Sequence, residues 1–258
     1  MSQEDSPGEG PVQALISQLR APLPAEGANQ VVDSALALCR QLYGSARSRD
    51  ALPLAQAALA RSREASDPNR ILRAAAACGM LSADMADIVA AVGYHVQALR
   101  VGMREENRGE MSRSWNNIGN ALGITGNYSM AARCFQRSLA LVAPMSGPVY
   151  SRFAASGNLA DCFFQLGNTS EGIAQAERAL HEMTPAFREH DPYAAVLLHR
   201  NIVANVAQCG TVCANWDSRR ANFRCVRGIL HQSTQSFQSY WSGRATMREV
   251  QSQQSILC

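Results

Sequence analysis

Cysteine and histidine are the residues of this chain whose types and spacing could build a metal centre. The densest group pairs Cys209 with Cys213 and adds Cys225, with His199 or His231 available as a fourth ligand. Common zinc modules favour Cys-x2-Cys or Cys-x4-Cys pairs, and the Cys-x3-Cys spacing found here matches neither. The sequence therefore predicts scattered thiols rather than a bound metal, and no cofactor.

The sequence carries none of the motifs that a catalytic site requires. It has no Gly-rich phosphate loop, no His-Glu-x-x-His pair, no nucleophile elbow and no pair of acids in a strand-loop setting. An enzyme needs such a constellation to bind and activate its substrate. We therefore expect a protein that is not an enzyme.

A second set of polar residues suits binding rather than catalysis. Asparagines recur at Asn117, Asn158 and Asn201, each inside a stretch with helical apolar spacing. An Asn amide offers both donors and an acceptor. Asn is a poor helix former, so three in register need a reason beyond tolerated surface polarity. Polar residues in the same stretches extend this candidate surface: Arg113, Asn116, Asn120, Asp161 and Arg200.

The residues from Ser112 to Met145 show which elements carry these side chains. A first apolar stripe has members three or four residues apart, as on one face of a helix: Trp115, Ile118, Gly119 and Leu122. Gly126-Asn127 interrupts the pattern. A second stripe follows and ends before Pro144: Tyr128, Ala131, Phe135, Ser138 and Leu139. The stretch predicts a helical hairpin.

The hairpin recurs along the chain. Its ending Ser138-Leu139 returns as Ala58-Leu59, Ala98-Leu99 and Ala179-Leu180, at steps of 40, 40 and 41 residues. Two aligned columns contain only small residues, one on the first helices (Cys39, Gly79, Gly119, Ala160) and one on the second (Ala51, Ala91, Ala131, Gly172). Repeats in register predict a solenoid, because a single hairpin of this size cannot bury its own apolar faces.

The order of residues from Trp115 through Gly119 and Ala131 to Pro144 resembles the tetratricopeptide repeat (TPR). Leu122 stands where the family usually has Tyr, and the period near 40 exceeds the family's usual period of about 34. The resemblance covers about Asp33 to Gly210. It implies an all-α, TPR-type α-solenoid of antiparallel hairpins in a right-handed superhelix, with four repeats and the first helix of a fifth in residues 30–210.

The resemblance also implies how the asparagines act. First helices line the concave groove of a TPR solenoid, and in peptide-binding members an Asn in this column hydrogen-bonds the ligand backbone. We therefore expect a protein or peptide partner in the groove, with Arg113 and Arg200 adding a salt-dependent term for an acidic ligand. Replacing Asn117 and Asn158 with Ala is expected to raise helix stability slightly.

Composition excludes several other classes of partner. A net charge of +3 with 17% charged residues gives no strong field for nucleic acid or an anionic membrane. No apolar run reaches the roughly 18 residues of a membrane span, and the first residues do not resemble a secretory signal. We expect a cytoplasmic protein with reduced, core-packed thiols. All 24 basic residues are Arg, which indicates a GC-rich and bacterial genome.

Both ends of the chain depart from the repeat. Residues 1–29 are rich in Pro and Gly around an amphipathic piece, and we expect a mostly disordered leader. The alternative is that Leu15, Ile16 and Leu19 dock on the first repeat or on another chain. Residues 211–258 lose the apolar pattern after Gly210. They are either a diverged polar cap or the product of a shifted reading frame. We favour the shifted reading frame.

These observations lead to three functional hypotheses. The first is a non-catalytic scaffold for protein–protein interaction. The second, suggested by resemblance to TPR regions of bacterial signalling proteins such as cyclic-di-GMP enzymes, is a regulatory or sensory portion of a larger protein whose output domain is absent from this chain. The third is redox sensing through the cysteines. The partner's identity and the oligomeric state do not follow from the sequence.

Overall fold

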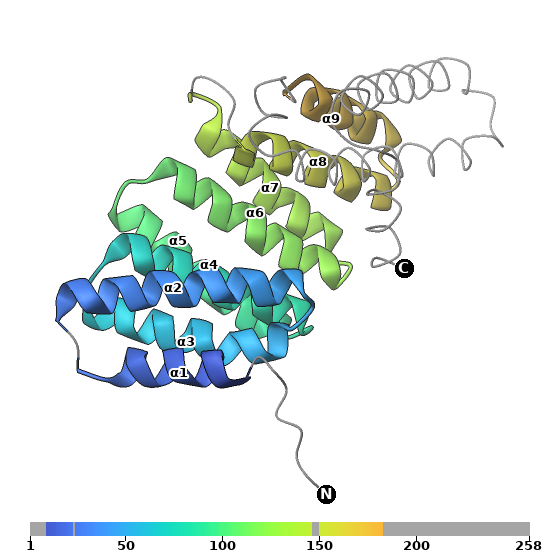
Figure 1. The fold of residues 1–258 in the computed structure, drawn as a ribbon. Coiled ribbons are helices and arrows are strands. Elements are labelled where there is room, and N and C mark those ends of the chain that lie inside the picture. The colour runs from blue at the N-terminus through green and yellow to red at the C-terminus, as the bar shows by residue number, and fades with distance from the viewer. Residues whose placement is uncertain (1–8, 23, 146–149, 183–258) are drawn as a thin grey trace, which may run out of the picture.

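Helices account for the regular structure of this chain. The computed structural model describes residues 9–22, 24–145 and 150–182, and over these ranges it contains nine helices and no strand. Figure 1 shows the successive pairs of helices from α2 to α9 stacked in chain order, with α1 beside α3 at one end. Their bounds are α1 Glu9–Arg20, α2 Ala25–Gly44, α3 Ser48–Glu64, α4 Pro68–Asp84, α5 Ile88–Arg104, α6 Arg108–Ile124, α7 Tyr128–Val142, α8 Tyr150–Gln165 and α9 Thr169–Glu182.

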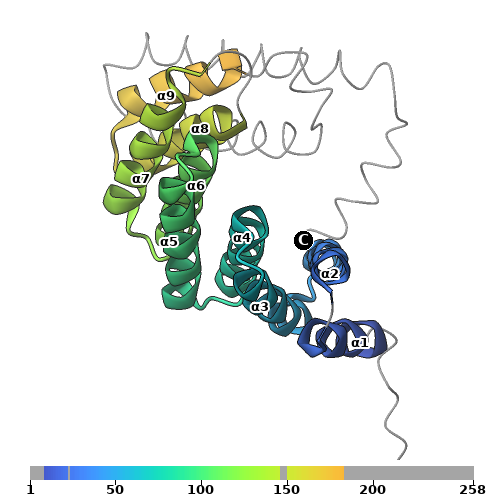
Figure 2. The same cartoon turned by 90° about the vertical axis from the view of Figure 1, so that its left-hand side faces the viewer.

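The helices pair into four antiparallel hairpins, α2–α3, α4–α5, α6–α7 and α8–α9, and each hairpin packs on the next. Figure 2 shows that the stack curves, with α2, α4, α6 and α8 on its inner side and α3, α5, α7 and α9 on its outer side. Consecutive inner helices also contact one another. The predicted all-α solenoid is confirmed, and the first helix of each hairpin lies on the inner side.

The connections between helices explain the period near 40. Helices α3 to α6 are each 17 residues long, and three residues link each helix to the next from α2 to α7. The middle residue of each link has positive φ, at Ala46, Ser66, Ala86, Glu106 and Gly126. The following backbone N–H then closes the preceding helix, as Asp87 N–H does by donating to the Ser82 carbonyl at 2.9 Å.

The same residue that closes one helix also begins the next. The side chains of Asp67, Asp87, Asn107 and Asn127 each accept a hydrogen bond from the backbone N–H three residues later. Such capping satisfies a donor that the first turn of a helix leaves free. Two helices and two such links make one repeat, whether the link lies within a hairpin or between hairpins.

Small residues allow the paired helices to approach closely. Every member of the two predicted columns is buried. A Cβ atom on Gly119 of α6 would lie 2.6 Å from the Phe135 ring of α7, and one on Gly79 of α4 would lie 2.4 Å from His95 of α5. In the last hairpin the roles reverse, because Phe164 of α8 packs against Gly172 of α9. The prediction of a close helix–helix seam is confirmed.

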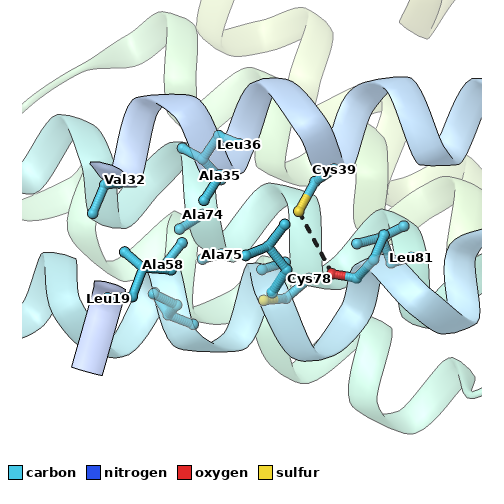
Figure 3. Packing of buried hydrophobic residues seen from close by; sticks show 14 of the residues in the cluster. Leu19, Val32, Ala35, Leu36, Cys39, Ala58, Ala74, Ala75, Cys78 and Leu81 are labelled. Atoms are coloured by element: carbon cyan, nitrogen blue, oxygen red, sulfur yellow. Dashed lines mark hydrogen bonds between the residues drawn. The ribbon is translucent and has the colours of Figure 1, made fainter. Parts of the chain in front are cut away.

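The prediction of a disordered leader over residues 1–29 is wrong for residues 9–20 and 25–29, which are helical. Helix α1 packs across α2 and α3, and it buries Val12, Ile16 and Leu19. Figure 3 shows Leu19 beside Val32 and Ala58. Each such side chain contributes about 1.5–3 kcal/mol of burial, enough to order a short helix that covers the first hairpin. The alternative that this segment docks on the first repeat is the correct one.

Ser138, which replaces the usual Ala of the repeat, has a specific partner. Its hydroxyl lies 2.8 Å from the hydroxyl of Ser112 on α6, and each side chain also donates to the other residue's backbone carbonyl, at 2.9 and 3.0 Å. Both residues are fully buried. This reciprocal pairing satisfies two polar groups inside the seam, so the hairpin tolerates serine where Leu72 and Ala98 pack in the preceding one.

The seam makes a testable prediction about Gly119. Replacing Gly119 with Ala forces a methyl group into the Phe135 ring, and we expect a loss of about 1–3 kcal/mol in the free energy of unfolding. Gly123, one turn later on α6, has no atom within 4 Å of the position that a Cβ would take, and it is the matched control. Gly123→Ala should be neutral or stabilising by up to about 1 kcal/mol. Urea unfolding of both variants measures the difference, and equal midpoints would contradict the seam.

Candidate functional site

The structure places six of the eight predicted site residues on two neighbouring inner helices. Helix α6 carries Arg113, Asn116, Asn117 and Asn120, and helix α8 carries Asn158 and Asp161. Arg200 and Asn201 lie outside the described residues. Since α6 and α8 contact each other directly, polar side chains from two repeats meet on the inner side of the stack.

Three of these asparagines form a hydrogen-bonded group, which we name the amide cluster: Asn116, Asn120 and Asn158. The Asn158 Nδ2 atom donates to Asn116 Oδ1 at 3.1 Å and to Asn120 Oδ1 at 2.9 Å. Asn116 and Asn120 are four residues apart on one helix, so they share the face turned toward α8. Asn116 is only 7% exposed, whereas Asn120 is exposed. The cluster therefore has a buried member, Asn116, and a solvent-exposed member, Asn120.

The sequence alignment places Asn117 and Asn158 in one column. In the structure, however, Asn158 bonds to Asn116 and Asn120 rather than to Asn117. Asn117 itself is half-buried on α6. Residues of one aligned column point in the same direction from parallel helices, so a side chain of α8 can bond to the residues of α6 that face it rather than to its column mate. The i, i+4 spacing of Asn116 and Asn120 is the sequence signal that marks them as a pair.

The amide cluster has hydrogen-bonding capacity left for a ligand. Asn158 uses both hydrogens of its amide nitrogen, and its Oδ1 atom accepts no hydrogen bond from the described residues. The Nδ2 atoms of Asn116 and Asn120 likewise donate to no group in that part of the chain. The cluster thus keeps one acceptor and donors on two residues, and a peptide unit has one N–H and one carbonyl to pair with such groups.

Two groups of charged residues on the inner helices form ion pairs within the chain. Arg113 forms an ion pair with Glu110 at 2.7 Å, one turn earlier on α6. Asp33 of α2 accepts from Arg70 at 2.7 Å and from Arg73 at 2.6 Å, both on α4. Burial opposes the charged form of Asp33, but these arginines outweigh it and hold the pKa of its carboxyl below the usual value. The i, i+3 spacing of Glu110 and Arg113 is the sequence signal for the first pair.

His95 and the described cysteines belong to the core. Burial lowers the pKa of His95 to about 4 and raises the pKa of Cys39, Cys78 and Cys162 to about 12. The imidazole is therefore neutral and the thiols protonated, which makes these cysteines poor nucleophiles and poor redox sensors. Among the described residues no three His, Cys, Asp or Glu side chains gather as a metal site would require.

The candidate metal ligands of the sequence, Cys209, Cys213 and Cys225 with His199 or His231, lie outside the described residues. So do residues 211–258 as a whole, and with them both readings of the tail. Within the described ranges, no helix combines the length and apolar character needed to span a membrane.

Comparison with family models and with curated proteins finds no match in sequence. Solved structures do share the fold. BtubC (BKLC) from P. vanneervenii aligns with a TM-score of 0.64 and 14% identity over 94% of this chain and 95% of that one. RapI in its apo form gives 0.57 and 11% identity over 91% of each chain. The TPR-like repeats of a Podosopora anserina kinesin light chain give 0.55 and 15% identity over 78% of this chain and 96% of theirs. The fold is that of a TPR-type repeat protein, as the sequence predicts.

The burial of His95 predicts a specific loss of stability in acid. The unfolded chain takes up a proton as the pH falls through about 6.5, whereas folded His95 resists protonation down to about 4. Stability is therefore lost on acidification, by about 2 kcal/mol between pH 7.5 and pH 5. His95→Phe, which copies Phe135 of the next repeat, should remove that part of the pH dependence. Urea unfolding of both proteins at the two pH values tests this, and parallel losses would contradict it.

Proposed function

We propose that this chain is a non-catalytic scaffold that binds an extended peptide segment of a partner protein across the inner faces of α6 and α8. The observation that carries the proposal is the amide cluster, in which Asn158 is hydrogen-bonded to two residues of the neighbouring repeat. Its free acceptor and donors can bond to the backbone of a peptide, and this backbone is the same whatever the sequence of the peptide. Half-buried Asn117, beside the cluster on α6, adds a fourth amide.

Preorganisation is the physical reason for favouring these residues. An isolated surface Asn loses rotamer freedom when it binds a ligand, which costs about 0.5–1.5 kcal/mol. Asn158 is already held by two hydrogen bonds, and Asn116 by its burial, so their side chains lose little further freedom. The net gain of about 0.5–1.5 kcal/mol per hydrogen bond to the ligand is then largely retained.

Likeness in fold to the repeats of a kinesin light chain, to BtubC and to RapI supports the scaffold rather than the particular groove residues. In this proposal the curved stack presents its inner helices to the partner, and the outer helices support them. Residues of the first two hairpins contribute less, since Asp33, Arg70 and Arg73 bond mainly to one another.

The test begins with selection of binders from a display library of random linear peptides, using the full chain as target. A selected peptide is then synthesised and titrated by fluorescence anisotropy against the parent and its variants. The double variant Asn117→Ala, Asn158→Ala should bind about tenfold or more weakly, because two backbone hydrogen bonds are lost. Gln136→Ala, on the exposed outer side of α7, is the matched control and should bind like the parent.

Stability must be measured alongside affinity. The structure changes the expectation for Asn158, because its removal leaves the buried Asn116 oxygen without a donor and should cost about 1–3 kcal/mol. The single variant Asn117→Ala breaks no hydrogen bond between described residues, so it reports on binding alone and should still weaken it. A selection that enriches no peptide, or a double variant that binds as tightly as the parent while folded, would contradict the proposal.

A further inference from the structure

Among the acidic residues of the inner helices, Asp33 and Glu110 bond to arginines, whereas Glu26, Asp84 and Asp161 do not within the described ranges. Of these three, Glu26 and Asp84 are exposed, and Asp161 is half-buried on the helix that also carries Asn158. Asp161 forms no ion pair within the described ranges. The one hydrogen bond that its carboxylate accepts there comes from Gln165 Nε2, one turn later on α8, at a long 3.4 Å. A half-buried carboxylate therefore lies on the inner side of the stack without a cation from the described part of the chain.

The place of Asp161 relates it to the amide cluster. It follows Asn158 by three residues on α8, so the two side chains lie on the same side of that helix, roughly 5–6 Å apart at Cβ. In the repeat alignment Asp161 also occupies the column of Asn120, which bonds to Asn158. The Asn amides, which can bind a ligand's backbone, thus lie next to the Asp161 carboxylate, which can bind a basic side chain.

Arg113 is the other charged residue of α6 and α8 that is predicted from the sequence to bind a ligand. The ligand predicted for it is acidic. The charge of Arg113 is already matched by Glu110 at 2.7 Å within the same helix. An acidic ligand at Arg113 would compete with Glu110 for the guanidinium. A basic ligand meets Asp161 without displacing any ion-pair partner among the described residues. Charge complementarity on α6 and α8 therefore favours a cationic side chain.

We propose that the peptide segment bound by the amide cluster carries a basic side chain, Arg or Lys, that pairs with the Asp161 carboxylate. This inference rests on the proposed function and names the chemistry of its partner. The amides fix the ligand backbone without regard to sequence, and Asp161 selects the residue at one position. An arginine can satisfy both carboxylate oxygens at once, whereas a lysine acts as a point charge.

The experiment repeats the library selection on the parent, on Asp161→Asn and on Glu171→Gln. Asp161→Asn keeps the shape of the side chain but removes its charge, and Glu171→Gln removes a charge from the exposed outer side of α9. We expect peptides selected on the parent and on Glu171→Gln to share a basic residue at one fixed position. That preference should disappear on Asp161→Asn, whose thermal unfolding should match that of the parent.

A titration then tests the ion pair between Asp161 and the basic residue of the peptide. The selected peptide, and a copy with its basic residue replaced by Gln, are each titrated against the parent and Asp161→Asn. Either single change should weaken binding at least fivefold, and the second change should add little to the first. Peptides enriched without a basic residue, or with acidic residues instead, would overturn the inference and leave the scaffold proposal standing. A selection that enriches nothing on the parent would overturn both.

Discussion

The close approach of the two helices of each hairpin is the constraint on which the rest of the structure depends. Gly79 against His95, and Gly119 against Phe135, set the separation of the helices, since any larger residue at the glycine would meet the ring. Small residues recur in these columns in all four hairpins, each hairpin packs on the next, and the stack curves. Curvature brings consecutive inner helices into contact, and only then does Asn158 of one repeat reach the asparagines of another.

The inner side of the stack divides into two parts with different chemistry. Between α2 and α4, Asp33 bridges Arg70 and Arg73, so this part holds its hairpins together with charges that are already paired. Between α6 and α8, the amide cluster joins the repeats with neutral groups that keep unused donors and acceptors. Ion pairs exposed to solvent add little to stability, typically about 0–1 kcal/mol. The amides of the cluster are held in place by buried Asn116, so they present a fixed geometry to a ligand. In the proposed function, the contacts with the peptide are therefore made by the third and fourth hairpins.

The hairpins and their small-residue seams could be predicted from the sequence, because each depends on spacing within a helix and on its repetition. The inner position of the first helices was implied by the resemblance to the tetratricopeptide repeat. Helix α1 was predicted only as an alternative: its amphipathic pattern is visible in the sequence, but the burial of Val12, Ile16 and Leu19 depends on faces of α2 and α3 that the local pattern does not reveal. The left-handed links at Ala46, Ala86 and Glu106 lack the usual glycine, and the hydrogen bonds that close each helix impose them. Asn116, Asn117, Asn120 and Asn158 lie on the expected helices, but their pairing depends on which faces of α6 and α8 meet, which sequence alignment does not determine.

Side-chain amide resonances in a nuclear magnetic resonance titration test the central claim most directly. The amide groups of Asn116, Asn117, Asn120 and Asn158 each give a resolved pair of nitrogen-bound proton signals once assigned by substitution. Adding a library-selected peptide to the isotope-labelled full chain should shift the signals of Asn117 and Asn158 in step with saturation. The Gln136 signals on the outer helix α7 should stay unchanged. Saturable binding that moves the Gln136 signals and leaves those of Asn117 and Asn158 in place would contradict the account.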